Sequence, residues 1–200
     1  MNTTLEIQEN TVTAAAPAFV IAGESLEHVL VREALLDRAM GEGRRRKSSE
    51  KLRRGRLPAE GLSFAALDDN GVLAGTVRLW DVHAGLDGFG FPVSALLLGP
   101  LAVDPLAAGC GIGSALMHHA ISEARRLGHG AILLVGDPEY YARFGFTAEK
   151  TGALAMPGPY EKRRFLALEL KPGYLNGAHG VLRASGRKVP RVVVSLRQSA

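Results

Sequence analysis

The sequence predicts one α/β domain of the α+β kind, in which helices flank a central, twisted, mixed sheet. Three observations predict this fold class. The chain has 200 residues, of which 46% are hydrophobic, enough for one core of ordinary size. Helical and strand patterns alternate along it. Short runs of consecutive apolar residues, such as 131–135, are typical of strands buried on both faces.

The domain boundaries follow from where these patterns begin and end. Residues 1–17 are polar or alanine-rich, and we interpret them as a loose tail. Residues 18–171 hold the domain itself. Residues 172–200 form a C-terminal extension, which carries one further strand pattern at 192–196.

The first elements of the domain are a strand and a helix. Residues 18–22 form a short apolar run, and a helical pattern covers 25–41, with Ser25 as its cap and Gly41 at its end. The apolar residues expected to face the core are Leu26, Val29, Leu30, Ala34 and Leu36.

A hairpin and a long strand come next. Two strand patterns, 62–67 and 72–80, flank Asn70-Gly71, which predicts a β-hairpin. The glycine-rich residues 83–92 predict a loop. Residues 93–103 are almost continuously apolar, as expected of a strand buried on both faces. Gly99-Pro100 interrupts this strand, so we expect it to be bent or bulged, because proline cannot donate to a sheet ladder.

The second half of the domain begins with a helix over 112–127, where apolar residues recur at helical spacing. The strand at 131–135 leads into a short helix over 137–145. Asp137 caps this helix, and Gly145 ends it. Residues 165–170 are interpreted as a late strand.

The composition excludes several classes of protein. A single cysteine excludes an internal disulfide and fits a reducing compartment. The N-terminus lacks a basic region followed by an apolar stretch, and no apolar run is long enough to span a bilayer. We therefore expect a cytoplasmic protein with no membrane partner.

The net charge of +4 is concentrated in one segment. Residues 44–56 hold eight basic residues and one acid, a net charge of +7, which leaves −3 for the rest of the chain. This basic segment is either a solvated surface helix or loop, or a patch for acidic substrates, nucleic acid or coenzyme phosphates.

A glycine loop, "AAGCGIGS" at 107–114, lies between the bent strand and the helix. A helix N-terminus offers unpaired backbone N–H groups and a positive partial charge, and glycines let a bulky anion approach them. The loop therefore either holds a pyrophosphate or makes a tight strand-to-helix turn. It is neither a P-loop nor the dinucleotide fingerprint, because it lacks the Lys-Ser/Thr pair of the first and the glycine spacing of the second.

The region 96–148 resembles the GNAT superfamily of acetyl-CoA-dependent N-acetyltransferases. In that family a strand ending in an L-x-V-x-P pattern precedes a glycine loop and a helix, and a tyrosine stands four residues before a Gly-Phe pair. The matching residues are Leu101, Val103, Pro105, Gly111, Gly113, Tyr141, Gly145 and Phe146. One departure is Ala108, where the family usually has Gln or Arg.

The resemblance implies a sheet splayed at 93–103, with acetyl-CoA as co-substrate. It also implies that the basic segment 44–56 lines or covers the entrance for the acceptor. It implies that the pantetheine pairs with the backbone of Leu101, Ala102 and Val103. It implies that Tyr141 donates a proton to the leaving thiolate. The residues implied to hold the pyrophosphate are Ala108, Gly109, Cys110, Gly111, Ile112, Gly113 and Ser114.

The general base is not identified by the sequence. No Asp or Glu lies between Pro92 and Val103, where the family often places one. His83 is a titratable candidate near the expected acceptor cleft, against the alternatives of an ordinary loop histidine and of bound water. His118 and His119 have no second ligand pair at metal spacing, so we expect no metal site.

The expected reaction is direct transfer of the acetyl group to an amine, on a small molecule or a peptide. Two other functions stay open. A non-catalytic acyl-CoA-binding or regulatory module is suggested by Ala108 and the missing base. A nucleic-acid-binding protein would act through 44–56, but that segment lacks interleaved aromatic residues. The acceptor and the oligomeric state, including a homodimer, are left open.

Overall fold

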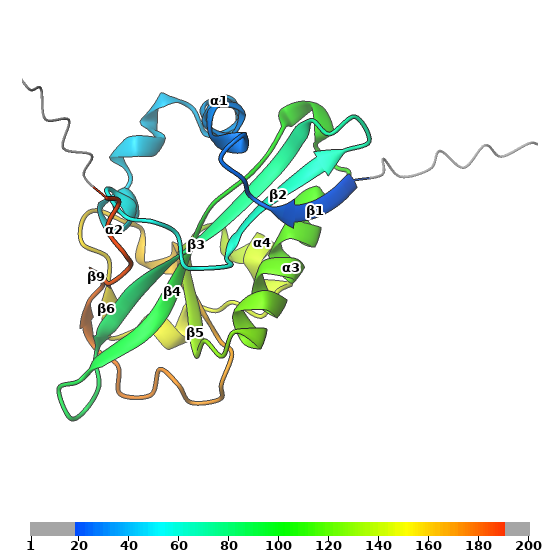
Figure 1. Ribbon diagram of the computed structural model, residues 1–200. Helices are drawn as coiled ribbons and strands as arrows, with labels where there is room; N and C mark the ends of the chain where they lie inside the picture. The colour runs from blue at the N-terminus through cyan, green and yellow to red at the C-terminus, as the bar shows by residue number, and fades with distance from the viewer. Residues whose placement is uncertain (1–18, 191–200) are drawn as a thin grey trace, which may run out of the picture.

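The central sheet has seven strands in a computed structural model that describes residues 19–190 (Figure 1). Its order is β1-β2-β3-β4-β5-β7, with β9 paired to β3. All neighbours are antiparallel except β4 and β5, so the sheet is mixed, as predicted. The strands are β1 (Phe19–Gly23), β2 (Ser63–Asp68), β3 (Leu73–Leu86), β4 (Pro92–Val103), β5 (Ala131–Val135), β7 (Phe165–Glu169) and β9 (Arg183–Ala184).

Helices and two further strands surround this sheet. The two further strands, β6 (Leu154–Ala155) and β8 (Gly180–Val181), pair with each other in a small separate sheet. The α-helices are α1 (His28–Met40), α2 (Glu50–Arg53), α3 (Ile112–Arg126) and α4 (Pro138–Ala142). The 3₁₀ turns are η1 (Glu42–Arg46), η2 (Pro105–Ala107), η3 (Glu149–Thr151) and η4 (Lys162–Arg164). None of the helices within 19–190 is long and apolar enough to cross a membrane.

The bend predicted in β4 is confirmed. Val77 of β3 pairs with Leu101 and Leu79 pairs with Leu98, so Gly99 and Pro100 are two residues opposite one, which is a β-bulge. On its other edge β4 pairs with β5 only through Leu96 and Leu97. Beyond that point the two strands part, and the sheet is splayed as expected.

Both faces of the splayed strands are buried near their pairing point. Leu96 and Leu98 pack into a cluster beneath α3, which lies along one face of the sheet (Figure 1). Ala95 and Leu97 pack into a second cluster on the opposite face. The apolar run of β4 was predicted to be a strand buried on both faces, and the structure confirms this.

The predicted buried face of α1 is confirmed for Leu36 and wrong for the other four residues, which are exposed. Leu26 and Leu30 are 90% and 82% exposed, whereas Arg32, Leu35 and Leu36 are buried. Arg32 is buried because it forms ion pairs with Glu24 and Glu33. Apolar spacing could not reveal this face, because a charged residue forms part of it. The helix also starts at His28, without a side-chain cap from Ser25.

The strand β3 extends further than predicted, through residues 83–86 that we assigned to a loop. The extra length is paired on one edge with β4 and on the other with β9. Residues 172–190 include β8 and β9. They contribute Leu175, Ala178 and Leu182 to the second buried cluster. The tail expected at 1–17 and the strand expected at 192–196 lie outside the described residues.

Candidate active site

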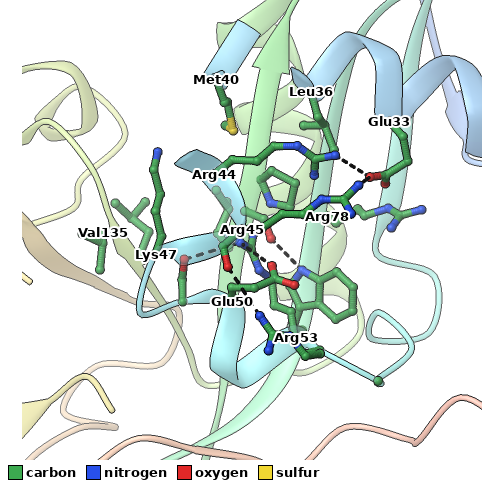
Figure 2. Close-up of a pocket in the computed structure, with 18 of the residues that line it drawn as sticks. Glu33, Leu36, Met40, Arg44, Arg45, Lys47, Glu50, Arg53, Arg78 and Val135 are labelled. Atoms are coloured by element: carbon green, nitrogen blue, oxygen red, sulfur yellow. Dashed lines mark hydrogen bonds and ion pairs between the residues drawn. The ribbon is translucent and has the colours of Figure 1, made fainter. Parts of the chain in front are cut away.

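A cavity of about 570 Å³ opens where β4 and β5 part (Figure 2). Its walls come from α1, the basic segment, the middle of β3, the bulge of β4, the end of β5 and Tyr141. The bulge is held by Trp80 of β3, whose indole Nε1 donates to the carbonyl oxygen of Gly99 at 2.6 Å. A volume in this range suits a small-molecule site.

Tyr141 reaches this cavity from the short helix α4. Asp137 caps the helix by accepting from the backbone N–H of Glu139 at 3.2 Å. Gly136 leaves room for the tyrosine ring, because a Cβ there would collide with it. Burial, together with Tyr140, raises the pKa of Tyr141 to about 12. The hydroxyl is therefore protonated at neutral pH and can act as a proton donor.

Tyr140 points elsewhere, although it neighbours Tyr141 in the chain. Its hydroxyl lies 3.0 Å from the place that a Cβ on Gly113 would occupy, so it lies against the glycine loop. The guanidinium carbon of Arg143 lies 4.5 Å from the centroid of its ring. Tyr140 thus lies against the glycine loop, whereas Tyr141 lines the cavity.

The glycine loop has the geometry of an open helix start. Gly109 and Gly111 have φ of +84° and +78°, values that favour glycine. Gly111 is the N-cap of α3, and no side chain caps the helix. A Cβ at either glycine would meet nothing within 4 Å, so the loop surface is open. Its backbone N–H groups are therefore accessible to an anion.

The end of β4 connects the loop to the cavity. Leu101, Ala102 and Val103 pair with β3 on one edge. Their other edge lies beyond the last residue pair with β5, at Leu97 and Leu133. The backbone of this stretch therefore borders the splay between the bulge and the glycine loop. The predicted coenzyme-binding residues therefore lie in two stretches, the end of β4 and the glycine loop, which Asp104 and η2 connect.

Part of the basic segment is buried against the cavity, while other basic residues of the segment are exposed. Arg44 and Arg53 have side chains only 12% and 11% exposed. Arg44 donates to Glu33 and to Asp37, both at 2.6 Å. The interpretation of the segment as a solvated face was therefore wrong for these residues. The members of the segment that line the cavity with a positive charge are Arg44, Arg45, Lys47, Arg53 and Arg54.

Two carboxylates that the sequence analysis missed also line the cavity, Glu33 and Glu50. Burial alone would raise the pKa of Glu33, but hydrogen bonds from Arg44 and Arg32 outweigh it and hold that pKa below its ordinary value. Glu50 accepts from Arg53 at 3.2 Å. Glu50 is the single acid in the basic segment, and this feature of the sequence could have identified it. No comparable feature of the sequence marks Glu33.

The histidines do not form the sites considered from the sequence. His83 does not line the cavity with Tyr141; it lies with His179 at a separate hollow of about 160 Å³. His118 and His119 pack edge-on against Phe144 and Phe64. Among residues 19–190 no three His, Cys, Asp or Glu side chains are grouped to hold a metal.

Comparison with known proteins agrees with this geometry. Residues 30–146 match the model of the acetyltransferase (GNAT) family. The uncharacterized N-acetyltransferase YhbS of Escherichia coli K12 is 30% identical over 121 residues, which cover 60% of this chain and 70% of YhbS.

Solved structures give the same result. The crystal structure of E. coli YhbS in complex with CoA aligns with a TM-score of 0.71 and 28% identity, over 86% of this chain and 93% of that one. A GNAT family acetyltransferase from Brucella melitensis, in complex with acetyl-CoA, aligns with a TM-score of 0.54 and 25% identity, over 76% and 96% of the two chains. The chain therefore belongs to the GNAT family of N-acetyltransferases and is an acyltransferase.

Proposed function

We propose that this protein transfers the acetyl group of acetyl-CoA directly to an amine bound in the cavity beside Tyr141. The observation that carries the proposal is that Tyr141 and the β4 bulge line one cavity, and that the free edge of β4 leads from it to the glycine loop. A co-substrate lying along that edge would bring its thioester to Tyr141.

The coenzyme would be held mainly by backbone groups. The pyrophosphate would lie on residues 108–114, where a helix start contributes about 0.3–1 kcal/mol to a nearby anion. Ala108 adds no charge to this contact. The pantetheine amides would pair with 101–103. The binding of CoA by YhbS and of acetyl-CoA by the Brucella protein supports this assignment.

The reaction needs a neutral amine and a proton for the leaving group. The neutral amine nitrogen attacks the thioester carbonyl carbon, the carbon–sulfur bond breaks, and the thiolate takes the proton of the Tyr141 hydroxyl. The nitrogen, which becomes cationic on attack, gives a proton to water, and the Tyr141 phenolate regains a proton from water. Deprotonating an amine of pKa about 10.4 costs about 4.6 kcal/mol at pH 7. The positive charges around the cavity lower this cost, because they disfavour the ammonium form, and water accepts the proton.

Release of free CoA from acetyl-CoA, measured with a broad panel of amines, tests the proposal. Amine-dependent release with matching N-acetylated product is the expected result. If the protein binds CoA but releases no thiol with any amine, it is an acyl-CoA-binding module instead. Steeply salt-dependent binding of RNA or DNA would favour the nucleic-acid alternative, although Arg44 and Arg53 are engaged within the cavity wall.

A further inference from the structure

The cavity beside Tyr141 carries more positive than negative charge. Six of its lining residues are cationic and two are acidic. Arg44 is neutralised by Glu33 and Asp37, and Arg78 of β3 is neutralised by Glu24. Lys47 and Arg54, in contrast, make no ion pair with any carboxylate that the structure describes.

Arg53 is a buried guanidinium with donors to spare. Its Nη2 donates to Glu50 at 3.2 Å and to Ser49 at 3.5 Å. Its Nε is buried and has no hydrogen-bond partner in the described part of the chain. Both of these hydrogen bonds are made by Nη2, so Nε is left unpaired among residues 19–190, and an unpaired buried donor carries a cost of about 1–3 kcal/mol.

This guanidinium lies over the bulge of β4. Its Nη1 is 3.8 Å from the place that a Cβ on Gly99 would occupy. Arg53, which Figure 2 shows among the residues around the cavity, lines it together with Tyr141. An acceptor whose amine reaches the thioester near Tyr141 would thus have Arg53 and Lys47 in the wall around the rest of its body.

A planar guanidinium with free donors binds carboxylate and phosphate oxygens through charge-assisted hydrogen bonds. A cationic acceptor, such as a polyamine or a lysine in a basic peptide, would instead meet like charges on several sides. Burial lowers the pKa of Arg53 despite the neighbouring Glu50, and a bound anion would offset the effect of this burial.

We propose that the acceptor is a small amine that also carries an anionic group, a carboxylate or a phosphate, and that Arg53 binds this group with help from Lys47. The proposal rests on the acetyltransferase function proposed above. The anion fixes the far end of the acceptor, and its amine is left to face the thioester. The coenzyme phosphates are not the anion in question, because no residue of the glycine loop lines this cavity.

The test uses acceptors in matched pairs that differ only in the anionic group. β-Alanine is compared with its amide, and phosphoethanolamine with ethanolamine, beside a lysine peptide and a polyamine. We expect kcat/KM for an anionic member to exceed that of its neutral partner by at least about tenfold, the effect of about 1.4 kcal/mol. If the anionic-to-neutral ratio of kcat/KM is larger for the β-alanine pair, the site prefers a carboxylate. If it is larger for the phosphoethanolamine pair, the site prefers a phosphate. Equal or better transfer to the neutral or cationic acceptors overturns the inference and leaves the acetyltransferase function intact.

Variants separate recognition of the anion from a structural role of Arg53. Arg53→Gln should lower the anionic-to-neutral ratio at least tenfold through the acceptor KM, and it should leave the affinity for CoA unchanged. Lys47→Gln should lower the ratio less, and as an exposed residue it can be replaced without unfolding the protein. Arg46→Gln removes the same charge from the same segment outside the cavity lining, so it is the control. A ratio unchanged in both cavity variants overturns the inference.

The failure of the proposed function can be distinguished from the failure of the anion site. If no amine releases thiol, the acetyltransferase proposal fails, and the anion site is then decided by binding. The CoA-loaded protein is heated with each acceptor. Stabilisation by the anionic members only, lost in Lys47→Gln or Arg53→Gln, supports an anion site in the cavity. Equal stabilisation by neutral members contradicts it.

Discussion

At the scale of the residue, we propose that the hydroxyl of Tyr141 protonates the leaving thiolate, because it lines the cavity and is protonated at neutral pH. Tyr141→Phe removes only this hydroxyl, so fold and CoA affinity should be nearly retained. We expect kcat to fall by about 10- to 1,000-fold, or about 1.4–4 kcal/mol of barrier. Steady-state kinetics measure the effect. Tyr140→Phe is the matched control and should cost less, because that ring lies against Gly113. Equal, near-native rates for both variants would show that water protonates the thiolate.

The pKa of Tyr141 makes a second prediction at this scale. An ordinary tyrosine loses half of its protons near pH 10. Burial raises the pKa of Tyr141 to about 12, so kcat should show no loss of this donor between pH 7 and about 10.5. The same shift stabilises the folded protein below about pH 10, and that stability is lost as the pH rises towards the folded-state pKa. A fall in kcat centred near pH 10, absent from Tyr141→Phe, would contradict the shift.

At the scale of the element, the sequence was most informative where one local rule decides the structure. Gly99-Pro100 within an apolar run predicted a bent strand, and the bulge is there because proline cannot join the ladder. The pattern of Asp137 and Gly145 likewise predicted a short helix that the structure confirms, with α4 at its centre.

The sequence failed for elements whose position depends on distant charges. The buried face of α1 includes Arg32, which is neutralised by Glu24 from the preceding loop, while Glu24 also pairs with Arg78 of β3. Spacing along one helix carries no record of such partners. For the same reason Glu33 could not be assigned to the cavity, because α1 and β3 meet only in the folded chain.

The start of α3 gives the prediction that belongs to this scale. Gly111→Asp places a negative charge where the coenzyme pyrophosphate is proposed to bind, and it should weaken CoA binding by tenfold or more. Gly111→Asn is the matched control, since asparagine has the same shape and also tolerates the positive φ of this position. Calorimetric titration with CoA compares the two. If both variants bind CoA equally well, the pyrophosphate does not lie on this loop.

At the scale of the whole molecule, the splay that opens the site requires strong packing elsewhere. Beyond Leu97 and Leu133 the two central strands no longer pair, so they are held together by the clusters on both faces of the sheet. One of these clusters includes side chains from 172–190. This segment is tied to β3 by two backbone hydrogen bonds between Leu86 and His179, both of 2.9 Å. The extension thus supports the sheet from the face opposite α3.

The last prediction follows from this support. Leu182 is 1% exposed and packs in the second cluster, so Leu182→Ala should lower the free energy of unfolding by about 2–5 kcal/mol. The neighbouring Val181 is 49% exposed, and Val181→Ala should change the free energy of unfolding by no more than about 0.5 kcal/mol. Urea unfolding of both variants gives the comparison. Because Leu182 does not line the cavity, kcat per folded molecule should stay at the native value in both variants.

Equal, small losses of stability in the two variants would show that the C-terminal segment contributes little to the core. A loss of kcat in Leu182→Ala without a loss of stability would instead mean that the segment acts on the site itself.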